Sequence, residues 1–286
     1  MATPAPDWYP DPSGAAELRY WDGGEWTRSV VVAGEVTERP MPWPPVTAVD
    51  PGPPDERVQL PGRASLYGLA GFVLGMALAL GLSIAGIVLD LPEIAILLLN
   101  LAGLWTGLLG ACWLASRRYG SGRLLRDYGL RIGGRDVGRG LLMSLAARLA
   151  AGLIALPLSA LDERLEGGNT EVFGDVTYSV VTFALFATVV VVGAPLVEEL
   201  FFRGLLLRSL TTRMGQTPAL LLQAALFALA HFSPTLGLAN VSVIAVIGAS
   251  GVVFGLTARR WRVGTSVVAH AAFNLVSVVA LGFTAF

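Results

Sequence analysis

Long stretches without a charged residue limit the folds open to this chain more than any other feature of its sequence. Charged residues make up 14% of the chain, against about 25% in an average soluble protein. Each of the longest uncharged runs reaches or exceeds the ~20 apolar residues that cross a bilayer as a helix. These runs are residues 65–89, 94–116, 178–197, 214–258 and 263–286. The sequence therefore predicts an all-α membrane protein.

The number of spans follows from the lengths of these runs. Residues 214–258 are too long for one span, and Ser233-Pro234 and Gly237 favour a turn inside this run. Residues 141–160 form a further apolar segment with a single charge, Arg148. We therefore predict a polytopic bundle of about seven to eight transmembrane helices over residues 64–286.

The first 63 residues have a different composition and predict two further parts. Aromatic residues gather on both sides of Asp22-Gly23-Gly24, a sequence typical of a hairpin turn. We therefore predict a very small, β-rich and tryptophan-rich module at residues 1–46, and a proline-rich linker at residues 47–63. The module resembles one of unknown function found at the start of many bacterial membrane proteins. Its exposed aromatic residues are expected to be available to a protein partner; they are Trp8, Tyr9, Tyr20, Trp21 and Trp26.

Loops rich in arginine alternate along the chain with loops rich in acidic residues. Arginine gathers in residues 117–139, 203–213 and 259–262, whereas acidic residues predominate in residues 90–93 and 162–175. By the positive-inside rule, the arginine-rich loops face the cytoplasm. We therefore expect a multi-pass protein of the bacterial plasma membrane, with its N-terminus in the cytoplasm and its C-terminus outside. Arginines held between two membrane helices do not favour nucleic-acid binding.

Two adjacent carboxylates, Glu198 and Glu199, follow one of the uncharged runs. A charge at bilayer depth costs at least about 2.5–3.5 kcal/mol on insertion scales, so such groups must face the protein interior or water. Glu199 and Arg203 are four residues apart, which predicts an ion pair on one helix face. Glu198 points ~100° away from that pair. An unpaired carboxylate in apolar surroundings is suited to act as a general base.

Both histidines of the chain also lie in apolar runs. His231 follows Phe227 by four residues, and Asn274 follows His270 by four, so each pair shares a helix face. An intramembrane histidine is as often a packing residue as a functional one. Together with Glu198, however, these side chains can activate a water and stabilise an oxyanion, which is what amide hydrolysis requires. Counted from the cytoplasmic side, His231 lies deeper than His270, so a tilted or re-entrant segment is needed to bring it to Glu198.

Three motifs carry a resemblance to a known family. EELFFR (198–203) matches EExxxR, FALAH (227–231) matches FxxxH, and HAAFN (270–274) matches HxxxN, in this order and in successive apolar segments. In these motifs the chain resembles the CPBP family of intramembrane proteases, which includes the type II CAAX prenyl proteases and the bacterial Abi proteins. The resemblance covers roughly residues 140–286.

The resemblance implies a role for each motif residue. Glu198 would activate the hydrolytic water, and His231 would help to hold that water or a metal ion. His270 and Asn274 would stabilise the oxyanion. Glu199 and Arg203 would support the site as an internal ion pair, and Phe227 would pack against it. The implied substrate is a membrane-embedded or lipid-associated peptide.

Two questions stay open at this level. Glu198, His231 and His270 could form a zinc site with an open water position, or a site for another divalent metal, yet the HExxH signature of many zinc proteases is absent. The protein could also be a non-catalytic bacteriocin-immunity or membrane scaffold protein of the same family. A proton-coupled transporter is a third reading, but it predicts inverted repeats, and the sequence contains none.

Overall fold

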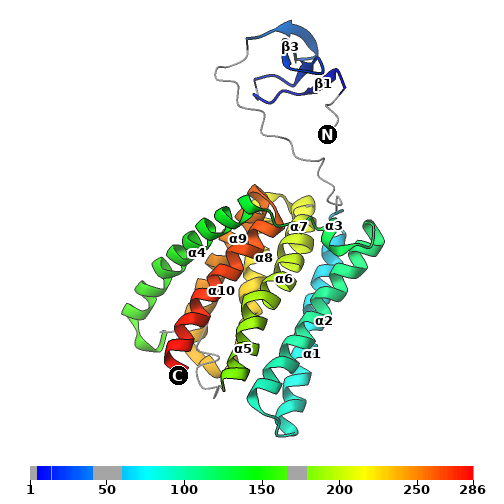
Figure 1. Cartoon of the computed structure of the whole chain (residues 1–286). Coiled ribbons are helices and arrows are strands. Elements are labelled where there is room, and N and C mark those ends of the chain that lie inside the picture. The colour runs from blue at the N-terminus through cyan, green and yellow to red at the C-terminus, as the bar shows by residue number, and fades with distance from the viewer. Residues whose placement is uncertain (1–4, 14, 41–59, 166–178, 286) are drawn as a thin grey trace. The chain divides into compact units, whose positions relative to one another are not determined.

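The computed structural model describes residues 5–13, 15–40, 60–165 and 179–285. The chain divides into two compact units, residues 1–55 and 56–286, which are described separately (Figure 1). This division falls within the predicted linker, residues 47–63, most of which lies outside the described residues.

The first unit contains a four-stranded antiparallel meander, as the sequence predicts for this part of the chain. Successive strands are neighbours in the sheet, in the order β1-β2-β3-β4. Aromatic rings meet edge to face across the strands, for example Trp8 with Tyr20 at 5.3 Å between ring centroids. The fully buried Arg19 pairs with Asp11 at 2.9 Å. The strands are β1 (Asp7–Pro10), β2 (Leu18–Trp21), β3 (Trp26–Val32) and β4 (Glu35–Glu38).

The second unit is helical, and it confirms the predicted polytopic bundle. Six of its helical segments are long and apolar enough to cross a membrane, and one further apolar helix is shorter. The helices are α1 (Ala64–Val88), α2 (Glu93–Tyr119), α3 (Leu124–Asp127), α4 (Gly134–Leu161), α5 (Val180–Thr188), α6 (Ala194–Glu198), α7 (Leu207–Met214), α8 (Gln216–Leu229), α9 (Asn240–Arg260) and α10 (Val263–Ala285). Two π-helical segments, η3 (Val189–Gly193) and η4 (Glu199–Leu206), join α5, α6 and α7 into one long span, and the short 3₁₀ segments are η1 (Glu163–Leu165) and η5 (Pro234–Ala239).

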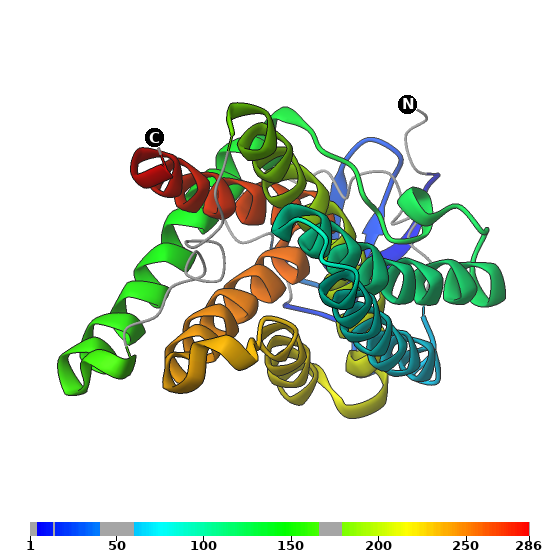
Figure 2. The same ribbon diagram turned by 90° about the horizontal axis from the view of Figure 1, so that it is seen from below.

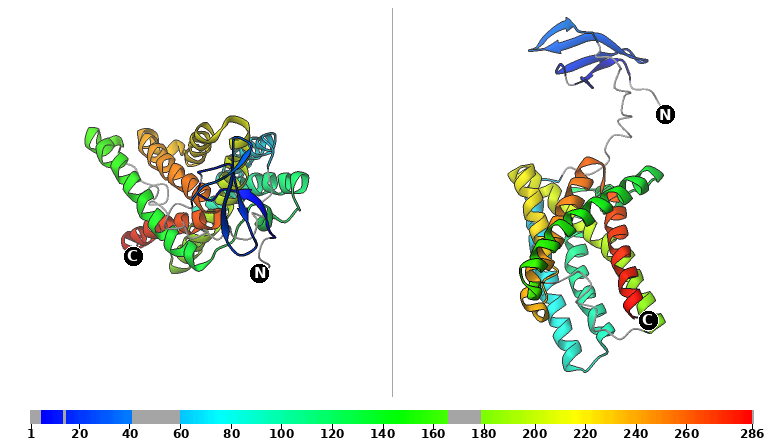
Figure 3. Two further views of the ribbon diagram at one scale, coloured as in Figure 1. Left: turned by 90° about the horizontal axis from the view of Figure 1, so that it is seen from above. Right: turned by 90° about the vertical axis from the view of Figure 1, so that its left-hand side faces the viewer.

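The long α5–α7 span occupies the middle of the helical unit. Helices α4, α9 and α10 lie on one side of it, and the α1–α2 hairpin lies on the other (Figures 2 and 3). The hairpin is tight because glycines face each other: a Cβ atom on Gly107 would lie 2.3 Å from the carbonyl oxygen of Gly71. Small residues let membrane helices approach closely where burial from water supplies no driving force.

Helix α8 stops short of a full span, and the chain turns back inside the unit. At 1.5 Å per residue its 14 residues extend ~21 Å, less than the ~30 Å of the hydrocarbon core. The predicted turn at Ser233-Pro234 and Gly237 is present here. The side chain of Asn240 holds it, donating to the carbonyls of Ser233 at 2.7 Å and Gly237 at 3.1 Å. His231 lies between α8 and η5, where the chain turns back.

The arginine-rich connection between α2 and α4 is anchored to the span that carries Glu198 and Glu199. Tyr128 is fully buried against Gly204, where an added Cβ would lie 3.1 Å from the tyrosine Cβ. Burial alone would raise the pKa of the neighbouring Asp127 carboxyl group. Hydrogen bonds from Ser116 and Ser121 have the larger combined effect in the opposite direction, so the pKa lies below its ordinary value. This connection therefore packs against the η4 segment.

The orientation predicts opposite results for reporters in two neighbouring loops. A reporter inserted after Asp90, between α1 and α2, should lie outside the cytoplasm, and one inserted after Gly122, between α2 and α3, should lie inside. The arginines at 117–139 are the physical reason. Enzyme reporters that work on one side of the membrane only measure this directly. Equal signals from both insertions would contradict the orientation.

Candidate active site

The span carrying the two carboxylates contains an irregularity just before them. The N–H of Ala194 donates to the carbonyl of Val189, five residues back, instead of to Val190 four residues back. The next nitrogen belongs to Pro195, which has no hydrogen to donate. The Val190 carbonyl instead accepts a hydrogen bond from the side chain of Asn274 on α10 at 2.9 Å. A π-helical turn of this kind inserts a residue into the helix and is frequent at functional sites.

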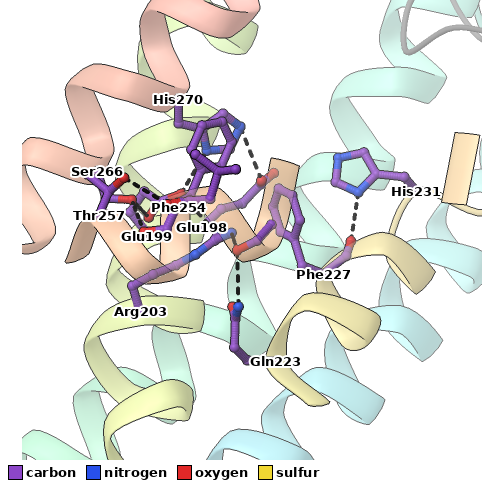
Figure 4. Close-up of polar contacts among 12 residues, drawn as sticks. Glu198, Glu199, Arg203, Gln223, Phe227, His231, Phe254, Thr257, Ser266 and His270 are labelled. Carbon is purple, nitrogen blue, oxygen red and sulfur yellow. Dashed lines mark hydrogen bonds and ion pairs between the residues drawn. The ribbon is translucent and has the colours of Figure 1, made fainter. Parts of the chain in front are cut away.

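Glu199 is fully buried, and both of its oxygens have hydrogen-bond donors. Its Oε1 atom lies 2.9 Å from Nη1 of Arg203 and 3.0 Å from Nδ1 of His270. Its Oε2 atom accepts from the hydroxyl of Ser266 at 2.6 Å (Figure 4). The predicted ion pair between Glu199 and Arg203 is therefore present, within a wider network that reaches α10.

Arg203 is held from several sides. Its Nη2 atom donates to the carbonyl of Gly251 at 3.2 Å, and Gln223 on α8 donates to the same oxygen at 3.1 Å. The guanidinium lies over the ring of Phe227 at 4.3 Å from the centroid. A buried charge that is paired, hydrogen-bonded and stacked on an aromatic ring fits a structural role within the apolar interior.

Glu198 contrasts with its neighbour. It is 7% exposed, and its Oε2 atom is buried without a hydrogen-bond partner in the part of the chain that the structure describes. Nε2 of His270 lies 3.9 Å from Oε2 of Glu198. This separation is too long for a direct hydrogen bond. The adjacent carboxylates therefore have different surroundings: Glu199 is saturated and Glu198 keeps a free oxygen.

His270 stands between the two carboxylates with its ring fixed in place (Figure 4). It stacks on Phe254 with 4.9 Å between centroids and an interplanar angle of 20°, and Phe227 contacts it edge-on at 5.6 Å. Its Nδ1 atom faces the Glu199 carboxylate, which accepts the Nδ1 hydrogen. A carboxylate on one ring nitrogen favours the tautomer that carries its hydrogen there, and Nε2, the other ring nitrogen, faces Glu198.

His231 takes a different position from the one expected for a partner of Glu198. Its Nδ1 atom is 2.8 Å from the carbonyl of Phe227, and its half-buried ring contacts the Phe227 ring at 5.0 Å. Among the described residues it forms no hydrogen bond or ion pair with Glu198. The structure thus brings His270 next to Glu198, while His231 meets the same Phe227 ring that contacts His270.

The described residues do not form a group of three or more His, Cys, Asp or Glu side chains that could hold a metal ion. Glu198, His231 and His270 were the three expected ligands. Their arrangement does not fit a site for zinc or another divalent metal.

Several polar side chains of this network were missed by sequence reasoning. Gln223 lies four residues before Phe227, and Ser266 lies four residues before His270, so each shares a helix face with a motif residue. This spacing is a pattern in the sequence from which both residues could have been predicted as part of the site. Arg148 was noticed as a lone charge, but its partners could not be read: it donates to the carbonyl of Phe273 and to Ser277, and lies over the Phe273 ring at 4.2 Å. These contacts join α4 to α10.

Comparison with known proteins finds two family matches. Residues 180–276 match the family described as type II CAAX prenyl endopeptidase, Rce1-like, and residues 6–41 match a family of unknown function, DUF2510. No curated protein and no solved structure matches the chain. The first match spans all three motifs, from Glu198 to Asn274. Residues 180–276, which contain the three motifs and membrane-spanning helices, are therefore similar to the Rce1-like type II CAAX prenyl endopeptidase family, and this similarity supports intramembrane protease activity in general.

Proposed function

We propose that this chain is an intramembrane endopeptidase that hydrolyses a peptide bond presented from the bilayer, with Glu198 as the base that activates water. The contrast between the two adjacent carboxylates carries this proposal. Three donors occupy Glu199, whereas Glu198 keeps an oxygen without a partner among the described residues. A carboxylate with a free oxygen in a site shielded from bulk water can accept a proton during the reaction.

The position of the water follows from the two groups that face each other. Nε2 of His270 and Oε2 of Glu198 are both acceptors, 3.9 Å apart. A water molecule between them can donate one O–H to each and so remove their mutual repulsion. Its oxygen lone pairs then point away from both groups, toward the carbonyl carbon of a substrate. Attack forms the C–O bond and moves the carbonyl π electrons onto oxygen as Glu198 takes a proton from the water. The oxyanion then re-forms the carbonyl as the C–N bond breaks, and the protonated Glu198 delivers its proton to the leaving amine.

The oxyanion of the tetrahedral intermediate requires hydrogen-bond donors. Asn274 uses one amide hydrogen on the Val190 carbonyl and retains a second. His231 has an Nε2 atom without a partner among the described residues, and it can donate from that atom when protonated. We assign the oxyanion side to these two residues and the water side to Glu198 and His270. This division exchanges the roles that the resemblance implied for the two histidines.

The substrate class we propose is a membrane-embedded or lipid-associated peptide. The base lies among apolar side chains, with Phe201 and Phe202 fully or almost fully buried beside it. A substrate must therefore approach from the bilayer or through the bundle. Purified protein in liposomes, mixed with a set of hydrophobic peptides, should generate new peptide termini that mass spectrometry detects. Unchanged peptides with every member of a chemically varied set would contradict the proposal.

The N-terminal module should be dispensable for hydrolysis. A chain that starts at Glu56 is expected to retain the kcat of the full chain within about twofold, because the site lies in the second unit. Leu60 must be kept, since it is 5% exposed and its carbonyl accepts a hydrogen bond from Thr212 at 3.1 Å. The control is a chain that starts at Arg63, which should unfold at a lower temperature. Loss of turnover by a well-inserted chain from Glu56 would contradict this prediction.

A further inference from the structure

The carbonyl of Val190 has lost the backbone donors that a helix would give it. In an α-helix it would accept from Ala194, but that N–H donates to Val189 instead. In the π-helical pattern it would accept from residue 195, which is a proline. A buried carbonyl without a donor is destabilising, and in a membrane no water from the bilayer can replace the donor. The Pro195 ring thus creates a local need for a hydrogen-bond donor from outside the span.

Asn274 supplies that donor. Its Nδ2 atom lies 2.9 Å from the Val190 oxygen, and the residue is 5% exposed. Asn274 comes from α10, one helical turn beyond His270. One face of α10 therefore presents His270 to the Glu198 carboxylate. The same face presents Asn274 to the carbonyl of Val190, which lies eight residues before Glu198.

We propose that Asn274 is a positioning residue: by completing the π-helical turn at Pro195 it sets the direction in which Glu198 points. A π-helical turn adds one residue to the helix, so moving or removing it rotates every following residue by ~100° about the axis. Glu198 would then turn away from His270. This role concerns the fold of the span and stands whether or not the chain hydrolyses peptides; only its catalytic consequence rests on the proposed function.

A double-mutant cycle separates this role from that of an oxyanion donor alone. In the Pro195→Ala variant, residue 195 gains an N–H that can donate to Val190, so Asn274 is no longer the sole donor. Asn274→Ala should therefore lower the thermal midpoint by roughly 2–4 °C or more in the natural background, and by much less in the Pro195→Ala background. Coupling of this kind arises only when two residues act on a shared element.

The matched control is Asn240→Ala, a second buried asparagine whose side chain holds the re-entrant turn and not the α5–α7 span. Its effect on the midpoint should be the same in both backgrounds. If Asn274→Ala also lowers the midpoint equally in both backgrounds, the positioning role is wrong. Asn274→Asp provides a second variant of matched size: an ionised carboxylate cannot donate, so it should destabilise the natural background at least as much as alanine does.

The same double-mutant cycle can also be measured through kcat and KM. Asn274→Ala should lower kcat with little change in KM, and in the Pro195→Ala background the further loss in kcat should be small. An oxyanion donor without a positioning role would lower kcat by a similar factor, on the order of 10²–10³, in both backgrounds. The thermal midpoints test the positioning role even in a chain with no measurable hydrolysis. Failure of the positioning role and failure of the proposed function therefore remain distinguishable.

Discussion

Replacing Glu198 with glutamine is expected to lower kcat by roughly 10²–10⁴, the range typical of a lost general base, while the protein inserts and folds normally. Glutamine keeps the shape of the side chain but cannot take a proton from water. The fold should tolerate the change because no side chain in the described part of the protein donates to Oε2 of Glu198. Hydrolysis of a peptide in liposomes and the thermal midpoint measure the two effects.

The control for this variant is Glu93→Gln. Glu93 begins α2 and is exposed, so the same chemical change is made outside the candidate site. It should leave both kcat and the thermal midpoint unchanged. Full activity of Glu198→Gln would remove Glu198 from the reaction, whereas no hydrolysis by the intact chain would favour a non-catalytic immunity or scaffold role.

Replacing Arg203 with methionine should reduce the amount of folded protein, unlike Glu198→Gln, which should leave the fold intact. The change leaves Glu199 buried and ionised, with Ser266 and His270 as its remaining donors. Breaking a buried ion pair by removing one partner typically destabilises by about 3–5 kcal/mol. We expect a low yield of monodisperse protein after extraction, which size-exclusion chromatography measures.

A second change should rescue much of this loss. Glu199→Gln combined with Arg203→Met removes both charges and keeps an oxygen that can accept from Ser266 or His270. The pair should therefore yield more folded protein than Arg203→Met alone. Arg213→Met serves as the control, since Arg213 is exposed near the end of α7 and should tolerate the change. No recovery in the double variant would mean that Arg203 supports the fold through its contacts with Gly251 and Phe227 instead.

The sequence predicted those features that depend on residues close together in one element. The uncharged runs predicted the helical bundle, the turn at Ser233-Pro234 and Gly237 is present, and the Glu199–Arg203 pair follows from i, i+4 spacing. Each of these rests on helix geometry or on turn chemistry, which a local pattern contains.

The partners across the bundle could not be read in the same way. Whether His231 or His270 meets Glu198 depends on how α8 and α10 pack against the α5–α7 span, and residues far apart in sequence decide that packing. The hydrogen bond from Asn274 to the Val190 carbonyl depends on the exact register of a π-helical turn. Pro195 is the one local sign of that turn in the sequence. Arg148 shows the same limit, because its partners Phe273 and Ser277 lie on α10.

The proposed role of Glu198 as the base of a protease can be tested by one measurement in cells. Membrane-associated peptides are compared by quantitative mass spectrometry between cells that contain the intact protein, Glu198→Gln and the control Glu93→Gln, all at equal levels in the membrane. We predict that at least one membrane peptide accumulates uncut with Glu198→Gln and is cut with the other two. Identical peptide inventories in all three strains would contradict the claim.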